Sequence, residues 1–498
     1  MDAVEFVALL LAGVGPALAL ARWSGLPPTI VLFGVGLAVG LLPGPTPVTM
    51  DPDLAISLFL PPIIYAGTVR TTPHLLRHTL LPGVAVGAAV ALTTVLSVAA
   101  AARWALLPGL SWTAAVLLGV TAALFDTRLF QEADGHPHVP RALADALQAR
   151  EMASRIVALT ALALALGTLR KGEAPALADA AVTMSWQLLG GALAGVAIGR
   201  AVLWLRDRAG PAPIEIAVSL ATPYLGALAA RDLNLSLAVV VITAALVVSA
   251  ARVNRETGEA RSSAEARISA TAFWEEASLL LSSVLFFLAG LGLPGALAGL
   301  GGWPAWRVAA AVVGLLVLVV GVQWIGSLVS TRLPPLREAL AGEGAAGQVA
   351  AAGVMAWAST RSVLGLIVVL SVPAAWPDGH PFAERGLLLV VAAGVILGSV
   401  LLQGLTLRRA VRGAELGGAG QAQREEEQAR RVAADARRQV GKEATHPEGF
   451  AAERRALVGL RESDEIGDEA LRRLLRETDL RKRAGEGDAS PGAPPPNP

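Results

Sequence analysis

Four charged residues of this chain lie within or beside long apolar segments, where charge is unfavourable. Glu151 and Arg155 open a predicted helix that is otherwise apolar, residues 152–168. Asp126 lies near the end of the apolar stretch before it, and Arg361 stands in the middle of a later one. A charged side chain at the centre of a bilayer costs roughly 2.5–3.5 kcal/mol even on the lowest scale, so such residues persist mostly where they move ions, bind substrate or pair internally. The pattern predicts a membrane transporter, and internal ion pairing is the alternative.

The composition supports a membrane protein and argues against an enzyme. Of 498 residues, 54% are hydrophobic and 16% are charged, and the mean hydropathy is +0.57. A soluble domain would carry about 25% charged residues. The chain has no cysteine, which excludes disulfides, thiol catalysis and cysteine-ligated metals. We find no phosphate loop, nucleotide fingerprint or hydrolytic triad, so we expect no enzymatic activity, cofactor, resident metal or nucleic-acid partner.

The apolar runs predict an all-α polytopic fold with about 13 transmembrane helices. The runs cover residues 4–21, 27–42, 54–69, 79–102, 111–130, 152–168, 177–199, 213–230, 235–251, 269–292, 307–331, 349–372 and 385–407. The second and third runs are short and interrupted by glycine or proline. Such runs indicate either broken helices, as in transporters, or ordinary short helices.

Basic residues predict the orientation in the membrane. With 13 crossings, one set of connections and helix ends holds 18 arginines and the other holds 6 basic residues. The side richer in Lys and Arg is cytoplasmic in most membrane proteins. We therefore expect the N-terminus outside the cell and the C-terminus inside.

The composition changes after the last apolar run. Residues 1–412 form the predicted transmembrane domain, and residues 413–487 are charged and rich in alanine, with no further spanning run. The alternation of Glu and Arg over residues 421–440 predicts a solvated helix, and residues 453–480 predict a small helical pair. Residues 488–498 are rich in proline and predict disorder.

Several motifs, in this order along the chain, resemble the monovalent cation:proton antiporter-1 family of bacterial sodium/proton exchangers. They are Phe59–Tyr65 (FLPPIIY), Phe273-Trp274-Glu275, Trp357–Ser362 (WASTRS) and Val400–Leu407 (VLLQGLTL). The resemblance implies inverted repeats with crossed broken helices, a dimerisation domain and a core domain. It also implies a homodimer in the bacterial inner membrane that works by alternating access.

The resemblance implies two places for the chemistry, and this chain departs from the family at both. The family's Thr-Asp-Pro, at a crossing of unwound helices, corresponds to Phe125-Asp126-Thr127. The Asn-Asp pair at the end of the family's EGESLLND motif corresponds to Ser154-Arg155. A carboxylate that binds either a cation or a proton couples the two fluxes, whereas arginine stays charged in proteins.

We assign expected roles on this basis. Asp126, Glu151 and Ser154 are candidates for ion and proton binding, with Asp126 as the carrier and Glu151 assisting. Arg155, Arg361 and Arg150 are candidates for charge pairing in the core.

Glu151 and Arg155 are four residues apart, so they share a helix face. Arg155 either neutralises Glu151 alone or also pairs with Asp126. Arg361 is expected to pair with Glu151, because Arg150 replaces the family's second Glu.

Two functions from different classes remain open. The first is secondary exchange of a monovalent cation, sodium foremost, for protons. The second is an antiporter-like protein that has lost cation exchange because Arg155 fills the cation site. It would serve as a sensor or regulatory subunit, or carry an anion.

Overall fold

A computed structural model provides the three-dimensional structure of the chain. It describes residues 3–42, 55–69, 80–127, 129–130, 141–171, 177–209, 212–250, 264–300, 302–334, 336–340, 344–373, 375, 379, 382–414, 416, 421–440, 447–463, 465–466 and 468–488. The predicted Pro-rich end, residues 488–498, lies outside these residues except for Asp488.

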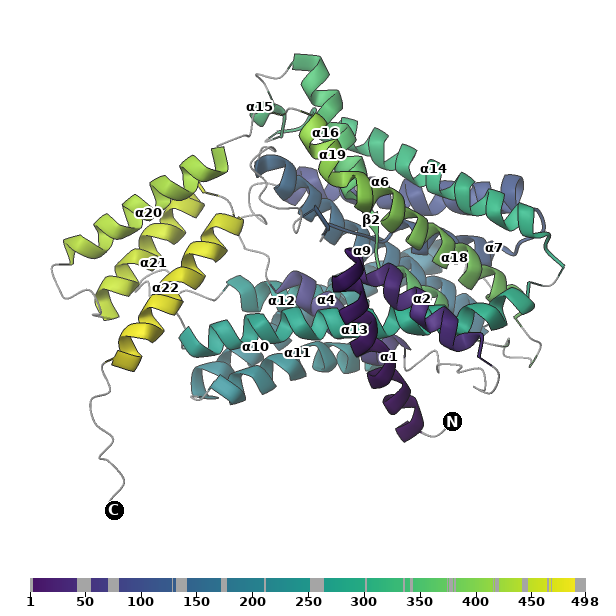
Figure 1. The fold of residues 1–498 in the computed structure, drawn as a ribbon, viewed down its shortest axis with the longest axis horizontal. Coiled ribbons are helices and arrows are strands. Elements are labelled where there is room, and N and C mark those ends of the chain that lie inside the picture. Colours follow the sequence, from purple (N-terminus) through teal and green to yellow (C-terminus); the bar gives the residue numbers. More distant parts are fainter. Residues whose placement is uncertain are drawn as a thin grey trace.

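The chain is almost entirely helical (Figure 1). Its elements are α1 (Ala3–Ser24), α2 (Pro28–Gly40), the π-helical η1 (Ala55–Phe59), α4 (Leu60–Thr68), α6 (Leu80–Ala101), the π-helical η2 (Ala102–Leu106), α7 (Trp112–Ala123), β1 (Phe125–Asp126), α9 (Arg141–Lys171), α10 (Leu177–Ala209), α11 (Ala212–Asp232), α12 (Leu237–Ala250), α13 (Ala264–Ala298), α14 (Ala305–Ser330), α15 (Leu336–Ala339), α16 (Gly344–Ala358), β2 (Thr360–Arg361), α17 (Leu364–Leu370), α18 (Arg385–Ser399), the π-helical η3 (Val400–Gly404), α19 (Leu405–Gly413), α20 (Gln421–Gln439), α21 (Pro447–Glu462) and α22 (Asp468–Asp488).

Helix length and hydropathy confirm a multi-span membrane protein. Within the described residues, 7 helices are long and apolar enough to cross a bilayer, and four shorter apolar helices accompany them. Every predicted apolar run falls on at least one helix. The exposed surface of these spans carries large apolar side chains, as lipid contact requires; Leu189 and Leu193 on α10 are examples, 69% and 74% exposed.

The helix breaks fall in the fifth and twelfth runs. There α7 gives way to the extended β1, and α16 gives way to β2 before α17 resumes. The second run is an uninterrupted helix, α2, and the third begins with one π-helical segment and continues as α4. The two runs with glycine and proline interruptions therefore each hold a continuous helix, over residues 28–40 and 55–68.

The helices pack in two groups. The crossing group contains α6, α7, α9, α14, α16, α17 and α18, and the α13 group contains α1, α2, α4, α10, α11, α12 and α13. Within the α13 group, glycine brings α2 and α13 into backbone contact. A Cβ on Gly36 would lie 2.1 Å from the Phe287 carbonyl oxygen, and a Cβ on Gly290 would lie 2.1 Å from that of Phe33. No other residue fits at these two positions without moving a helix.

The helix α9 begins ten residues before Glu151, so the prediction that Glu151 and Arg155 open a helix is wrong. Its first turns pack against α15, α16 and α19 through a separate apolar cluster that includes Leu143, Leu147 and Leu407. We call this end of the bundle, where α9 begins and α19 ends, the tail side. The helices α20, α21 and α22 lie beside the membrane-spanning helices as a group of their own (Figure 1).

Candidate functional site

Two unwound segments cross in the crossing group. The strand β1 pairs antiparallel with β2, with Phe125 opposite Arg361 and Asp126 opposite Thr360. The Thr360 hydroxyl also donates to the Asp126 carbonyl oxygen at 2.9 Å. Asp126 is half-buried, while Phe125, Thr360 and Arg361 are buried. The crossing therefore fixes the backbone of Asp126, while the residue as a whole stays partly accessible to solvent.

The broken end of α7 receives donors from two other elements. A helix end leaves its last carbonyls without intrahelical partners and carries a partial negative charge. The Ser154 hydroxyl on α9 donates to the Ala123 carbonyl at 2.6 Å, and the Arg361 guanidinium donates to the Ala122 carbonyl. Arg361 also donates to the carbonyl of Ser359. These bonds stabilise the break.

This arrangement corrects the expected partner of Arg361. Its side chain is 3% exposed and hydrogen-bonds to backbone carbonyls, so the prediction that it pairs with Glu151 is wrong. A cation at the C-terminal end of a half-helix is favourable because it faces the negative end of the helix dipole.

Glu151 and Arg155 form a buried ion pair on α9. Their side chains are 10% and 3% exposed. The other Glu151 carboxylate oxygen accepts a hydrogen bond of 2.6 Å from the Thr127 hydroxyl, next to Asp126. The ion pair that the structure gives Arg155 is with Glu151 rather than Asp126.

Glycine on α4 makes room for the Arg155 side chain. A Cβ on Gly67 would lie 2.5 Å from Nη1 of Arg155, well inside van der Waals contact. The guanidinium therefore lies against the bare backbone of α4, between the two packing groups.

Arg150 lies on another face of α9. It is 1% exposed, and its guanidinium donates to the Ser327 hydroxyl at 2.7 Å and to Oε1 of Gln323 at 2.6 Å, both on α14. These hydrogen bonds are to neutral groups. The structure thus brings Asp126, Glu151, Ser154, Arg155 and Arg361 to one crossing and turns Arg150 away toward α14.

Three polar residues of the last spanning helix, which we did not predict as site residues, also reach the crossing. The Ser399 hydroxyl accepts from the Arg361 backbone N–H at 2.9 Å. The Gln403 amide donates to the Ala356 carbonyl at 3.2 Å and accepts from Ser399. The third residue is Thr406, whose hydroxyl accepts from Trp357 at 2.7 Å.

The missed residues carry a sequence signal. Ser399, Gln403 and Thr406 are spaced by four and three residues within an apolar run, which places them on one helix face. Gln323 and Ser327 have the same spacing of four. The π-helical segment η3 lies between Ser399 and Leu405, and such segments occur frequently at functional sites. Within the described residues, no group of three or more His, Cys, Asp and Glu could hold a metal ion.

Comparisons with known proteins agree with this architecture. A family model described as "Sodium/hydrogen exchanger, transmembrane" matches residues 6–413. An uncharacterized Na+/H+ exchanger of Mycobacterium tuberculosis is 29% identical over 422 residues, which cover 83% of this chain and 74% of the relative. The Na+/H+ antiporter NhaP of Pseudomonas aeruginosa is 27% identical over 278 residues, covering 55% of this chain and 59% of that protein.

A solved structure has the same fold. The sodium proton antiporter MjNhaP1 of Methanocaldococcus jannaschii at pH 8 matches with a TM-score of 0.61 and 15% sequence identity. The match covers 83% of this chain and 98% of that one.

Proposed function

Because the chain belongs to the sodium/hydrogen exchanger family, we propose that it exchanges a monovalent cation, sodium foremost, for protons by alternating access. The position of Asp126 carries this proposal. It is an acidic residue at an unwound crossing of two broken helices, the kind of place where transporters hold substrates and coupling ions. The relatives named as Na+/H+ exchangers or antiporters support the same substrates.

In this proposal the carboxylate of Asp126 binds either a cation or a proton, but not both. That competition couples the two fluxes, because the site returns across the membrane only when one of them is bound. Glu151 assists from α9, where its carboxylate accepts a hydrogen bond from the Thr127 hydroxyl, next to Asp126 in the chain. Ser154 holds the end of α7 and offers its oxygen beside the crossing.

Arg155 acts as a fixed internal cation in this scheme. It neutralises Glu151 through the buried ion pair, which leaves Asp126 as the exchanging carboxylate. Arg361 positions the crossing through its bonds to both broken helices.

A second candidate function rests on the same ion pair. If Arg155 occupies the volume that a cation would need, the fold is retained without cation exchange. The chain would then serve as a sensor or regulatory protein, or carry an anion. The close approach of Arg155 to Gly67 favours this reading, because the guanidinium takes up space that any larger side chain at position 67 would need.

The transporter is also expected to have a defined architecture and orientation in the membrane. About 13 spans arranged as inverted repeats form a dimerisation domain and a core domain over residues 1–412. The protein is a homodimer in a bacterial inner membrane, with its N-terminus outside and residues 413–487 as a cytoplasmic tail. The distribution of basic residues supports this orientation, and the antiparallel pairing of two broken helices supports the inverted repeats.

The test uses inside-out vesicles from an antiporter-deficient host. Dissipation of the pH gradient is measured after pulses of sodium, lithium and potassium in turn. Exchange that Asp126→Asn abolishes would support Asp126 as the carrier. Asp232→Asn is the matched control, because the Asp232 side chain is 62% exposed at the end of α11 and far along the chain from the crossing.

No response to any cation, with the protein verified in the membrane, would exclude the first candidate. Arg155→Asp then separates the remaining explanations. Gain of sodium-dependent exchange in this variant would show that Arg155 alone blocks the site, as the second candidate requires.

A further inference from the structure

Five arginines are buried in the part of the chain that the structure describes, and one of them differs from the rest in its partners. Arg155, Arg454 and Arg461 each contact a carboxylate. Arg361 donates to a carbonyl at the broken end of α7, which carries a partial negative charge. Arg150 is only 1% exposed and has neither a carboxylate nor a helix end among its partners. Buried charges in proteins are normally paired, so Arg150 lacks the negative partner that the other four have.

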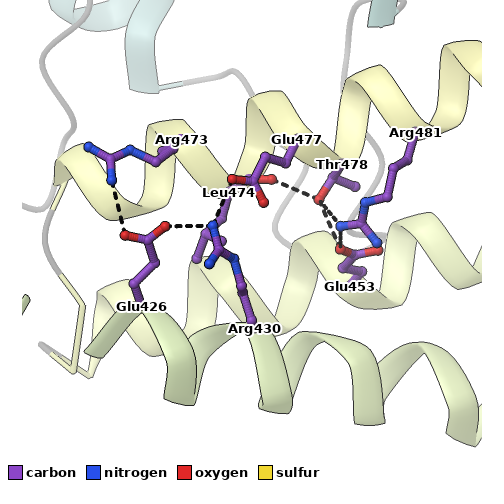
Figure 2. Close-up of polar contacts among 8 residues, drawn as sticks. All are labelled: Glu426, Arg430, Glu453, Arg473, Leu474, Glu477, Thr478 and Arg481. Carbon is purple, nitrogen blue, oxygen red and sulfur yellow. Dashed lines mark hydrogen bonds and ion pairs between the residues drawn. The ribbon is translucent and has the colours of Figure 1, made fainter. Parts of the chain in front are cut away.

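Carboxylate partners are present even where an arginine needs them least. In the helices after the last spanning segment, Figure 2 shows Arg430 and Arg473 both reaching Glu426. It also shows Arg481 reaching Glu453. The three arginine side chains are about half exposed, so water solvates them and each pair adds little. An arginine buried among membrane-spanning helices has no such water, and there the lack of a counter-charge is costly.

The partners of Arg150 belong to one face of α14. Its guanidinium donates from Nη1 to the Ser327 hydroxyl and from Nη2 to Oε1 of Gln323. The Ser327 hydroxyl gives its own proton to the Gln323 backbone carbonyl at 2.7 Å. Gln323 and Ser327 are 1% and 0% exposed. We call these three residues the Arg150 cluster.

Two donor atoms of the Arg150 cluster have no hydrogen-bond partner. They are Nε of Arg150 and Nε2 of Gln323, and both are buried. Each of these nitrogens can donate and cannot accept. A buried donor without an acceptor pays the full cost of leaving water. The cluster therefore lacks two things at once, an acceptor for two donors and a negative charge for one cation.

The helix α6 closes the cluster off from lipid. A Cβ on Gly87 of α6 would lie 2.8 Å from Cα of Arg150, and a Cβ on Gly326 of α14 would lie 2.2 Å from Cγ2 of Val90 on α6. The three helices α6, α9 and α14 thus meet around the cluster. Gln323 precedes the end of α14 by seven residues, a rise of about 10 Å, so the cluster lies toward the tail side.

The buried charges around the crossing also leave an excess of positive charge. Arg150, Arg155 and Arg361 are buried there. The carboxylates that face this charge are those of Glu151, which is buried, and Asp126, which is half-buried. With both carboxylates ionised, one positive charge is still unbalanced.

We propose that the Arg150 cluster binds a small monovalent anion, of which chloride is the model, as a counter-ion within the membrane domain. The anion would accept hydrogen bonds from Nε of Arg150 and Nε2 of Gln323. One unbalanced cation calls for a single negative charge, and enclosure by three helices calls for a small ion. A water molecule would accept the same two bonds but would leave the charge of Arg150 unbalanced.

This anion site is separate from the proposed ion-exchange site. Arg155 already has the carboxylate of Glu151, whereas Arg150 turns away toward α14. The inference is therefore independent of whether the chain exchanges cations, and its test needs no transport assay.

The first measurement is the unfolding temperature of the purified full chain. Sodium gluconate is replaced in steps by sodium chloride, and separately by sodium bromide, at constant ionic strength and pH. A ligand that binds only the folded protein raises its stability until the site is full. We expect a saturable rise of several degrees with either halide.

Gln323→Glu is the informative variant, because it places a fixed carboxylate where the neutral amide contacts Arg150. We expect this variant to unfold in gluconate at a temperature at or above that of the unchanged chain in saturating chloride, and to gain nothing further from halide. Arg150→Gln removes the cation and should also abolish the halide response. Arg208→Gln is the matched control, since it removes an exposed arginine and should keep the full response.

The position of the anion is tested without any variant. Crystals of the unchanged chain grown in bromide locate the ion by its anomalous scattering, and we expect a peak in contact with Nε of Arg150. No halide response in the unchanged chain would overturn the proposal and leave water as the partner of the two donors. An equal response in Gln323→Glu or Arg150→Gln, or bromide peaks only elsewhere, would overturn it as well, because the anion would then bind at another place.

Discussion

Ser154 donates a 2.6 Å hydrogen bond to the carbonyl of Ala123, the last residue of α7. The bond joins the helix that carries Glu151 and Arg155 to the helix whose break carries Asp126. Both residues are buried. The position that forms half of the family's Asn-Asp pair thus serves here to stabilise the end of a half-helix.

Ser154→Ala should destabilise the protein. The substitution leaves a buried carbonyl without that donor, which costs about 1–3 kcal/mol. We expect a lower temperature of unfolding in detergent, measured by fluorescence-detected size exclusion after heating. Ser185→Ala is the control, because the Ser185 hydroxyl bonds to its own helix at an exposed position. Equal unfolding temperatures for the two variants would contradict a role for Ser154 in stabilising the break.

Gly67→Ala should disturb Arg155. The added Cβ would lie 2.5 Å from Nη1, and overpacking of this kind costs about 1–3 kcal/mol. The measurement is again the unfolding temperature. Gly34→Ala on α2 is the control, since nothing lies within 4 Å of its Cβ position. The loss in the double variant Gly67→Ala with Arg155→Ala should be smaller than the sum of the two single losses, and a purely additive result would argue against the close contact.

Glu151→Gln should be more damaging than loss of both charges. The single variant leaves the 3% exposed Arg155 side chain without its counter-charge, which costs roughly 3–5 kcal/mol. The double variant Glu151→Gln with Arg155→Met removes the unpaired charge and should unfold at a higher temperature than the single variant. The opposite order would show that Arg155 has another anionic partner in the folded protein.

Gln403→Leu should weaken the link between the last spanning helix and the crossing. It removes the donor to the Ala356 carbonyl and the acceptor of the Ser399 hydroxyl, at a cost of about 1–3 kcal/mol. We expect a lower unfolding temperature and a severalfold lower rate of cation-driven pH-gradient dissipation. Leu402→Ala is the control, since Leu402 is an exposed neighbour in the same segment and makes neither hydrogen bond. Equal losses in the two variants would exclude the hydrogen bonds as the cause.

Hydropathy alone predicted the spanning helices but not their breaks or ends. A membrane-spanning segment must be apolar whether its backbone is helical or extended. Hydropathy therefore predicts ordinary helices for residues 111–130 and 349–372, although each contains an extended segment. Conversely, the start of α9 is too polar to be counted as a span, yet it is helical. Its alanine, leucine, glutamine and arginine residues are good helix formers, and packing against α15, α16 and α19 stabilises it.

The residue types of the site could be predicted from charge in apolar segments, whereas their partners could not. The residue type marks Arg150 as a core residue, but its neutral partners Gln323 and Ser327 on α14 could not be predicted from the sequence. The carbonyl partners of Arg361 could not be predicted either, because they arise only where α7 unwinds beside β2. The amino-acid sequence does not show which backbone carbonyls a helix break will free for side-chain donors.

The π-helical segment η3 has a genetic consequence. A π turn accommodates one residue more than an α turn, and here it stands between Ser399 and Thr406. Deleting a single codon within Val400–Gly404 would remove that extra residue and let the helix continue as a regular α-helix, so Ser399 and Thr406 would keep their positions on the helix. Deleting a codon in a regular α-helical turn of the same span would instead rotate every later residue by about 100°. The π turn is therefore the place in the last spanning helix where an in-frame deletion changes the direction of the following chain least.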